Sequence, residues 1–285
     1  MTQQFPELWY TEKYTQHFNS SIRIKEKLFS KKSKFQLIEV FDTYEFGKVL
    51  YLNNALMVTE RDEFFYHELI VHTAMTACAE AKNVLIIGGG DGGVAREVCK
   101  YPVEKVKVIE IDPEVIEVCK KYFPEIAKGF EDKRVEVLNQ DGFEYVKNCK
   151  ETYDVIIIDS SDMVGPPPIG PAEILSSREF MENCKKILSE EGIFVAQSET
   201  PIFYFEFIKE YLKRVKSVFP VVKYAVIPAP SYGGIWSLTF ASKGNDPSEP
   251  KREAPSGLKC YNKELHKAIF SLPNIWRMDE ISNRI

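Results

Sequence analysis

Runs of branched apolar residues alternate with amphipathic stretches through the middle of the chain. The runs occupy residues 83–87, 105–112, 135–141, 154–162 and 193–199, with segments of helical spacing between them. Uninterrupted runs of this kind are typical of parallel strands that are buried on both faces. The alternation therefore predicts an α/β fold with a mostly parallel, doubly wound, Rossmann-like sheet. Two later runs, 221–228 and 235–242, have no helix between them and predict an antiparallel edge.

The N-terminal part of the chain shows shorter β segments instead. Residues 35–41, 48–52 and 55–58 are rich in branched and aromatic residues, and Asn53-Asn54 separates the last two. Asparagine tolerates the positive φ angles of a tight hairpin turn, so we predict a small antiparallel β domain over residues 1–61. Gln36 would by default be an outward-facing polar residue of its strand.

A helix is predicted to connect this β domain to a Rossmann-like domain over residues 62–285. Asp62 is a candidate N-cap, and the apolar residues of the following segment fall on one face. Tyr66 and His67 lie near its start, and they approach the sheet only if the two domains pack directly. Residues 260–285 are predicted to form a helical tail whose Trp276 docks on the body or on a partner.

A glycine-rich loop follows the first run of the predicted parallel sheet. Gly88, Gly90 and Gly93 fit G-x-G-x-x-G, a spacing that lets a nucleotide approach the backbone at the start of a helix. Glu110, about 20 residues further on, is placed to accept ribose hydroxyls. Asp91 inside the loop would repel a pyrophosphate and attract an ammonium group. The sequence thus predicts a ligand that is a nucleoside at one end and a cation at the other.

Carboxylates follow each of the first four predicted strands. They are Asp91, Glu110, Asp141 beside Gly142, and Asp159 with Asp162. Parallel strands of such a sheet bring their carboxyl ends to one crevice. Each acid could instead cap the next helix, and for Asp141 alone that interpretation is the simpler one. Repulsion within the whole set would be costly without cations to balance it.

These acids suit one reaction in particular. A sulfonium group makes an adjacent carbon open to attack by an amine, but aliphatic amines with a pKa of about 10 stay protonated at neutral pH. A carboxylate must hold the ammonium and accept its proton during the attack. We expect Asp159 to be that base, Asp162 to bind the far ammonium of a diamine, and Asp91 to bind the amine of the donor.

The composition of the chain limits which kinds of binding partner are expected. The chain has 285 residues and a net charge of -5, with no basic stripe that would indicate nucleic acid. It shows no signal sequence and no apolar stretch long enough to span a bilayer, so we expect a cytoplasmic protein with no membrane partner. Its six cysteines are scattered without a C-x-x-C pair. His67 and His72 are five residues apart and share no helix face, so neither a metal nor a permanently bound cofactor is predicted.

Several motifs together resemble the polyamine aminopropyltransferase family. The chain contains IIGGGDGG, EID, QDG and DSSD in this order, together with QLIEVF, RDEFFYHE and IPAPSYGGIWSLTF. The resemblance covers almost the whole chain and implies a Rossmann-like sheet of the methyltransferase type. It implies transfer of an aminopropyl group from decarboxylated S-adenosylmethionine, as co-substrate, to putrescine, giving spermidine and methylthioadenosine. Members are usually dimers or tetramers, so a homodimer or homotetramer is expected.

The resemblance also implies roles for individual residues. Asp159 matches the proton acceptor, Asp162 the residue that binds the acceptor amine, and Asp91 the residue that holds the aminopropyl amine. The other positions expected to bind the donor are Gln36, Gly88, Gly90, Glu110, Asp141, Gly142 and Pro171. Those expected near the amine are Tyr66, His67, Ser160 and Tyr232.

The chain departs from the family pattern at two places. Met163 to Pro167 are extra residues before the family's P-I-G-P-A-E, so Pro166 and Pro171 compete for the adenine contact, and Pro171 is favoured because it lies within the match. Tyr232 is displaced by one residue relative to Trp236. Both departures concern the acceptor pocket.

Three alternatives to a putrescine-using enzyme stay open from the sequence. Agmatine, cadaverine or spermidine could be the acceptor. An NAD-dependent oxidoreductase would also use the glycine loop and Glu110, although Asp91 and the lack of a second nucleotide-binding half argue against it. A noncatalytic polyamine sensor would have the same pocket.

Overall fold

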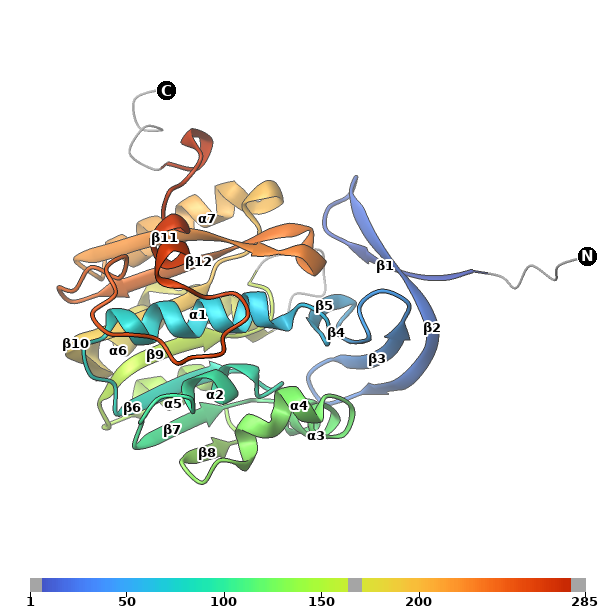
Figure 1. Cartoon of the computed structure of the whole chain (residues 1–285), viewed down its shortest axis with the longest axis horizontal. Coiled ribbons are helices and arrows are strands. Elements are labelled where there is room, and N and C mark those ends of the chain that lie inside the picture. The colour runs from blue at the N-terminus through green and yellow to red at the C-terminus, as the bar shows by residue number, and fades with distance from the viewer. Residues whose placement is uncertain (1–6, 164–170, 278–285) are drawn as a thin grey trace, which may run out of the picture.

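The computed structural model describes residues 7–163 and 171–277, which form two sheets (Figure 1). The first sheet is antiparallel, and its strands follow chain order. They are β1 (Leu8–Lys13), β2 (Asn19–Lys32), β3 (Leu37–Thr43), β4 (Lys48–Leu52) and β5 (Ala55–Thr59). Asn53 and Asn54 have φ of 49° and 68°, which confirms the predicted hairpin turn between β4 and β5. Strands β1 and β2 lie within the predicted β domain, but the prediction did not identify them as separate strands, because they carry many charged residues and are mostly exposed.

The second sheet has seven strands in the order β11-β12-β10-β9-β6-β7-β8. Five are parallel: β6 (Asn83–Gly88), β7 (Lys105–Ile109), β8 (Val135–Leu138), β9 (Tyr153–Asp159) and β10 (Leu188–Gln197). β12 (Gly234–Ser242) is antiparallel to both β10 and β11 (Val221–Ala229). The predicted fold class, with its antiparallel edge, is confirmed. The division into domains 1–61 and 62–285 stays a prediction.

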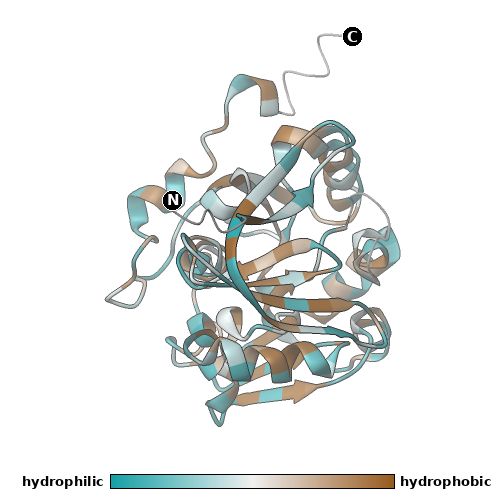
Figure 2. Ribbon diagram, turned by 90° about the vertical axis from the view of Figure 1, so that its right-hand side faces the viewer, coloured by the Kyte–Doolittle hydropathy of each residue, from teal (hydrophilic) through white to brown (hydrophobic). Residues whose placement is uncertain are grey.

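Helices surround the second sheet, whose strands are largely apolar in Figure 2. The α-helices are α1 (Glu63–Ala77), α2 (Gly93–Val98), α3 (Pro113–Tyr122), α4 (Pro124–Ala127), α5 (Gly142–Asn148), α6 (Arg178–Ile187), α7 (Pro201–Lys216) and α8 (Lys263–Ala268). The 3-10 helices are η1 (Lys128–Glu131), η2 (Pro171–Ser176), η3 (Pro230–Tyr232) and η4 (Asn274–Trp276). Within the described ranges, no helix has the length and apolarity that crossing a membrane requires.

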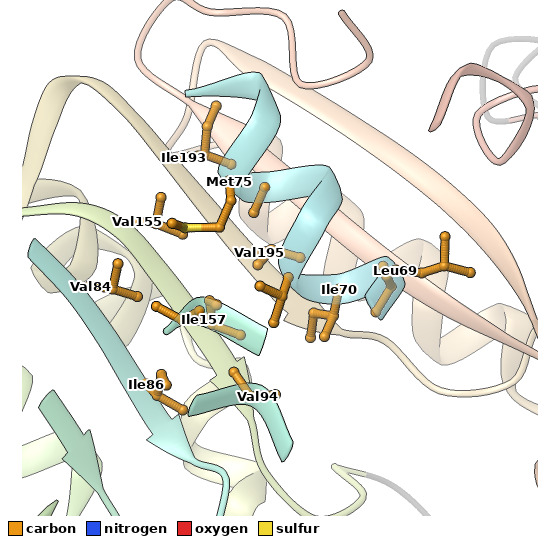
Figure 3. Packing of buried hydrophobic residues seen from close by; sticks show 14 of the residues in the cluster. Leu69, Ile70, Met75, Val84, Ile86, Val94, Val155, Ile157, Ile193 and Val195 are labelled. Atoms are coloured by element: carbon orange, nitrogen blue, oxygen red, sulfur yellow. The ribbon is translucent and has the colours of Figure 1, made fainter. Parts of the chain in front are cut away.

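Helix α1 packs at the centre of the largest apolar core. Its Leu69, Ile70 and Met75 belong to the same buried cluster as the sheet residues Val84 and Ile157, and Met75 points toward Val155 (Figure 3). The expectation of a single apolar face is wrong, because almost every residue of α1 is buried. The far side is covered by the segment after β12, where the carboxylate of Glu68 accepts three backbone N–H groups from residues 259–261 (Figure 1).

Two expectations about helix ends need correction. Asp62 precedes α1 but makes no side-chain cap; its carboxylate instead accepts hydrogen bonds from the Thr59 hydroxyl and the Ser231 amide. The tail is not one helix, because only α8 and η4 are helical among its described residues, and residues 278–285 lie outside the described part. Trp276 packs on Ile208 and Leu212, so it does dock on the body. The six cysteines are free thiols, as predicted.

Candidate active site

A cavity lies where the carboxyl ends of β6, β7 and β9 face the β4-β5 hairpin of the first sheet. Its lining includes the predicted site residues Gln36, Tyr66, His67, Gly88, Gly90, Asp91, Glu110, Asp141, Gly142, Asp159, Ser160, Asp162 and Tyr232. The two sheets therefore do pack directly, which was the condition for Tyr66 and His67 to approach the crevice. Pro171 begins η2, but its side chain lies outside the described part, as do Pro166 and the extra loop beyond Met163.

The glycines of the loop are required by protein contacts as well as by space for a ligand. Gly88 has φ of 84°, and a Cβ there would lie 2.0 Å from the backbone oxygen of Asp159. The same oxygen accepts a hydrogen bond from the Gly89 amide at 2.8 Å. A Cβ on Gly93 would lie 2.3 Å from Cε1 of His67. The loop is thus fitted closely to the end of β9 and to the imidazole of α1.

The end of the cavity at β7 contains a buried carboxyl group. Burial raises the pKa of Glu110 to about 7, although its Oε1 accepts the Asp112 amide at 2.8 Å. Asp112 in turn accepts hydrogen bonds from the Ser33 hydroxyl at 2.6 Å and from Nε2 of Gln36 at 3.1 Å. Gln36 is therefore buried and oriented toward the cavity, and its default interpretation as an outward-facing residue is wrong. Sequence reasoning missed Asp112, because an acid before a proline fits a helix cap.

Asp141 is both a helix cap and a cavity residue. Its Oδ1 accepts the amides of Phe143 at 2.7 Å and Glu144 at 3.2 Å. Gly142 follows, and a Cβ there would lie 2.5 Å from Cγ2 of Ile87. The capping interpretation and the binding interpretation of Asp141 are therefore compatible, since the cap fixes the carboxylate at the cavity wall.

The part of the cavity at the end of β9 is formed around Asp159. The Tyr66 hydroxyl donates to its Oδ1 at 2.9 Å. Burial and the nearby charge of Asp91 raise the pKa of Asp159 to about 7. Burial raises the pKa of Asp162 to about 7 as well. Without a cation in the cavity, both groups hold protons far more readily than exposed aspartates.

Asp91 is paired with an imidazole. Nε2 of His67 lies 3.2 Å from Oδ2 of Asp91, and Nδ1 lies 2.5 Å from Oε2 of Glu63. Burial disfavours the charged form of His67, but Asp91 and Glu63 outweigh it and raise the pKa of His67 well above its usual value. Asp91 also accepts the Gly93 amide at 2.7 Å. This aspartate is therefore ionised at the cavity wall.

The nearest approach to a metal site is formed by the same groups. Donor atoms of His67, Asp91 and Asp159 all lie within 4.8 Å of one another, a spacing that a cation could bridge. Both ring nitrogens of His67 already face carboxylates, however, and a protonated imidazole has no lone pair for a metal. The arrangement fits an ion pair better, and the absence of a metal stays a prediction.

The end of the cavity at Asp162 has two residues in or beside it that sequence reasoning missed, Glu12 and Gln197. Glu12 on β1 has its pKa raised to about 8 by burial and by the charge of Asp162, and its Oε1 accepts the Leu56 amide at 3.2 Å. Gln197 lines the cavity between the Ser161 carbonyl, at 3.3 Å, and Nε1 of Trp236, at 3.1 Å. Glu12 comes from the exposed hairpin of β1 and β2. In the sequence, only its position within the stretch ELWYTEKY, residues 7–14, could have pointed to it.

The aromatic wall of this end includes Tyr232. Its hydroxyl donates to the Met57 carbonyl at 2.5 Å, and its ring centroid lies 6.3 Å from that of Tyr66 and 5.4 Å from Trp236. The shift of Tyr232 relative to Trp236 in sequence thus leaves it in the cavity.

Comparison with known proteins decides the family. Residues 63–251 match the spermine/spermidine synthase domain, and residues 8–60 match the spermidine synthase tetramerisation domain. The chain belongs to the spermine/spermidine synthase family. Its enzymatic class is accordingly that of a polyamine aminopropyltransferase, which confirms the resemblance inferred from the motifs.

Individual relatives in the spermine/spermidine synthase family cover nearly the full chain. The polyamine aminopropyltransferase of Alkaliphilus metalliredigens is 45% identical over 278 residues, which are 94% of this chain and 96% of the relative. That of Clostridium perfringens is 45% identical over 276 residues, with the same coverage. A crystal structure of spermidine synthase in complex with the transition state analogue AdoDATO has a TM-score of 0.90 and 40% identity, and covers 96% of this chain and 95% of that one. Spermidine synthase from Thermotoga maritima has a TM-score of 0.89 and 39% identity, covering 96% and 94%.

Proposed function

We propose that the chain transfers the aminopropyl group of decarboxylated S-adenosylmethionine to putrescine, giving spermidine and methylthioadenosine. The observation that carries this proposal is that Asp91, Asp159 and Asp162 line one cavity together with the nucleoside-type end at Glu110. The related spermidine synthase structure with the transition state analogue AdoDATO supports it, because that chain matches nearly the whole of this one.

The donor would bind along the glycine loop. Glu110 and Gln36, which line the cavity, would bind the ribose and its substituents, and Asp141 with Gly142 would bind the adenine. Gly88 and Gly90 would allow the donor to approach the backbone, with Pro171 as a further adenine contact. Asp91 would bind the amine of the aminopropyl group. An ordinary methyl donor carries a carboxylate beside that amine, which Asp91 would repel, so the same residue selects the decarboxylated donor.

In the transfer step the acceptor nitrogen forms a bond to the carbon next to the sulfonium, and the carbon–sulfur bond breaks. The electron pair stays on sulfur, which leaves as the neutral thioether of methylthioadenosine. The nitrogen must lose protons to attack and to end as a neutral amine, and Asp159 would accept one from it. The Tyr66 hydroxyl on Oδ1, at 2.9 Å, would leave Oδ2 to face the amine.

The acceptor would be held by its far ammonium group. Asp162 lines the cavity, and its charge, together with burial, raises the pKa of the nearby Glu12 to about 8. An ammonium between them would relieve that repulsion. Ser160, Tyr232 and Gln197 line the same end. Agmatine, cadaverine and spermidine are the alternative acceptors. The alternative without catalysis is a sensor that binds amines and does not react with them.

The test is product identification by mass spectrometry after incubation with the decarboxylated donor and each amine separately. We expect methylthioadenosine and spermidine with putrescine, and slower release with the other amines. Faster turnover of another amine would replace putrescine as the acceptor. If the protein bound amines but released no methylthioadenosine, the polyamine sensor would be the remaining function. Asp159→Asn supplies the control, since it should bind amine but release no product above background.

We also propose that the protein is a homodimer or homotetramer in the cytoplasm. The match of residues 8–60 to a tetramerisation domain supports self-association. Leu8 and Trp9 on the edge strand β1 are about half exposed, as expected for side chains that a second copy would cover. Light scattering coupled to gel filtration would give the mass, and a monomer would overturn the proposal.

A further inference from the structure

We propose that Glu63 is a positioning residue that keeps His67 protonated and thereby sets the charge that Asp91 presents to the donor. Glu63 is on the first turn of α1, and it is not one of the residues that line the cavity. It acts only through the imidazole one helical turn further on. The inference deepens the proposed function on which its catalytic consequence rests, because it concerns how that site holds its charges.

Four side chains form a row of alternating charge from α2 to the cavity. Nη2 of Arg96 lies 2.8 Å from Oε2 of Glu63, and the same oxygen lies 2.5 Å from Nδ1 of His67. Nε2 of His67 then lies 3.2 Å from Oδ2 of Asp91. Both Glu63 and His67 are nearly inaccessible to solvent, with side-chain exposures of 8% and 3%. The row is therefore an internal feature that bulk salt screens weakly.

The geometry requires a proton on each nitrogen of His67. A neutral imidazole has one N–H donor and one acceptor, so it can serve only one of the two carboxylates. The other carboxylate oxygen would then face a nitrogen lone pair in a buried site. Arg96 offsets the charge of Glu63, and the imidazolium offsets that of Asp91. The absence of a side chain on Gly93 lets the ring sit against the start of α2, where a Cβ would collide with it.

The titratable and charged groups near His67 come from several elements. They are Glu63 and Tyr66 on its own helix, Asp91 on the glycine loop, Arg96 on α2 and Asp159 at the end of β9. The imidazolium favours ionisation of Asp159, whereas Asp91 opposes it. Removing the charge of Glu63 takes away one of the two carboxylates that stabilise the imidazolium. Asp91 would then act on Asp159 without compensation, and Asp159 would need a higher pH to ionise.

The chain offers a matched control for this change. Glu97 on α2 is also buried, lies 2.9 Å from Nε2 of His72 and binds the other side of Arg96 through Nε, at 2.9 Å. Glu97→Gln therefore removes another buried glutamate from a histidine contact, at a histidine whose second nitrogen faces the Tyr101 hydroxyl and not a cavity carboxylate. Glu63→Gln and Glu97→Gln should lose similar stability, whereas only Glu63→Gln should affect the site.

The first measurement needs no substrate. The protein has four histidines, and the nitrogen chemical shifts of His67 can be assigned by their loss in His67→Asn. We expect His67 to stay doubly protonated in the unmodified protein at pH values well above the ordinary histidine pKa of about 6.5. It should lose a proton at lower pH in Glu63→Gln than in the unmodified protein, and Glu97→Gln should show no such change. An unmodified His67 that titrates near pH 6.5 would overturn the inference, even if the variants fail to fold.

The second measurement is the pH profile of methylthioadenosine release. The acidic limb of kcat should move to higher pH in Glu63→Gln, by about one unit, and stay in place in Glu97→Gln. If neither the protonation of His67 nor the acidic limb of the pH profile changed in Glu63→Gln, the positioning role would be refuted. The proposed function would stay intact. If the unmodified protein releases no methylthioadenosine, the proposed function fails, and the nitrogen shifts still decide whether Glu63 holds the proton on His67.

Discussion

The fit between the glycine loop and the end of β9 gives a sharp prediction for Gly88→Ala. Gly88 has φ of 84°, and an added methyl carbon would lie 2.0 Å from the Asp159 carbonyl oxygen. Ordinary contacts begin near 3.4 Å, so the loop or the strand end must move by about 1.4 Å, the difference between those distances. The obstructing atom belongs to the backbone and cannot turn away as a side chain can. The change therefore displaces the residue that we propose as the base.

The magnitude follows from three contributions. A left-handed conformation costs alanine about 1–2 kcal/mol. Losing the hydrogen bond from the Gly89 amide to the Asp159 oxygen costs about 0.5–1.5 kcal/mol. Accommodating the extra methyl group in a packed region costs about 1–3 kcal/mol. The free energy of unfolding should fall by about 2.5–6.5 kcal/mol, and at roughly 2 °C per kcal/mol the Tm should fall by about 5–13 °C. Displacing a catalytic group by about 1 Å should lower kcat about 100-fold.

Gly244→Ala is the control, because Gly244 has an ordinary φ and an added Cβ there meets no atom within 4 Å. Differential scanning fluorimetry gives the Tm of both variants, and release of methylthioadenosine gives kcat. Gly244→Ala should match the unmodified protein within about 1 °C, since surface substitutions usually change stability by less than about 0.5 kcal/mol. If Gly88→Ala behaved in the same way, the close fit of loop and strand would be refuted.

The remaining predictions concern the carboxylates. Asp159→Asn should lower kcat by at least about 100-fold with the Tm preserved within a few degrees, and more than a tenth of normal turnover would remove Asp159 as the base. The raised pKa of Asp159, about 7, means that the free enzyme holds a proton on this base below that pH, so kcat/KM should fall as pH decreases through about 7; a flat profile from pH 8 to pH 6 would contradict this. Glu12→Gln should raise the KM of putrescine about 10-fold, corresponding to about 1.4 kcal/mol, and leave that of the donor unchanged. Asp162→Asn should raise the Tm of the empty protein while weakening amine binding, because a neutral amide avoids burying a charge; a lower Tm and unchanged amine affinity would argue against this role.

How far the sequence predicts the fold depends on where each strand lies. Strands β6 and β9 are buried on both faces, so their branched apolar runs identified them and their order with the helices fixed the sheet class. Strand β2 carries many charged residues and mostly exposed side chains, and it is held by backbone pairing with β1 and β3. Such pairing leaves no mark in composition. Helix α1 was misjudged for a related reason, since its buried polar residues such as Glu68 find partners about 190 residues away.

Whether a residue of the candidate site could be predicted from the sequence also depends on where it lies in the fold. Asp91, Glu110 and Asp159 could be predicted to converge because they follow parallel strands, and the fold alone brings such positions together. Glu12 and Asp112 could not. Glu12 lies near Asp162 but belongs to a hairpin of the other sheet, and the position of that hairpin depends on packing between sheets. Asp112 acts through Gln36, a contact between residues 76 positions apart.

The raised carboxyl pKa values explain why such a site suits a cationic substrate. Glu110, Asp159 and Asp162 each have a pKa near 7 in the empty cavity, and that of Glu12 is near 8. Because these folded-state values exceed those of an unfolded chain, about 4, the empty protein gains stability from these groups as pH falls from about 8 toward 4. Above that range the ionised acids destabilise the fold. A diamine and a sulfonium donor bring the positive charges that offset this repulsion, so part of their affinity comes from relieving a cost that the empty protein carries. Ionisation of Asp159 and binding of the cations are therefore coupled, and the base becomes competent as the substrates arrive.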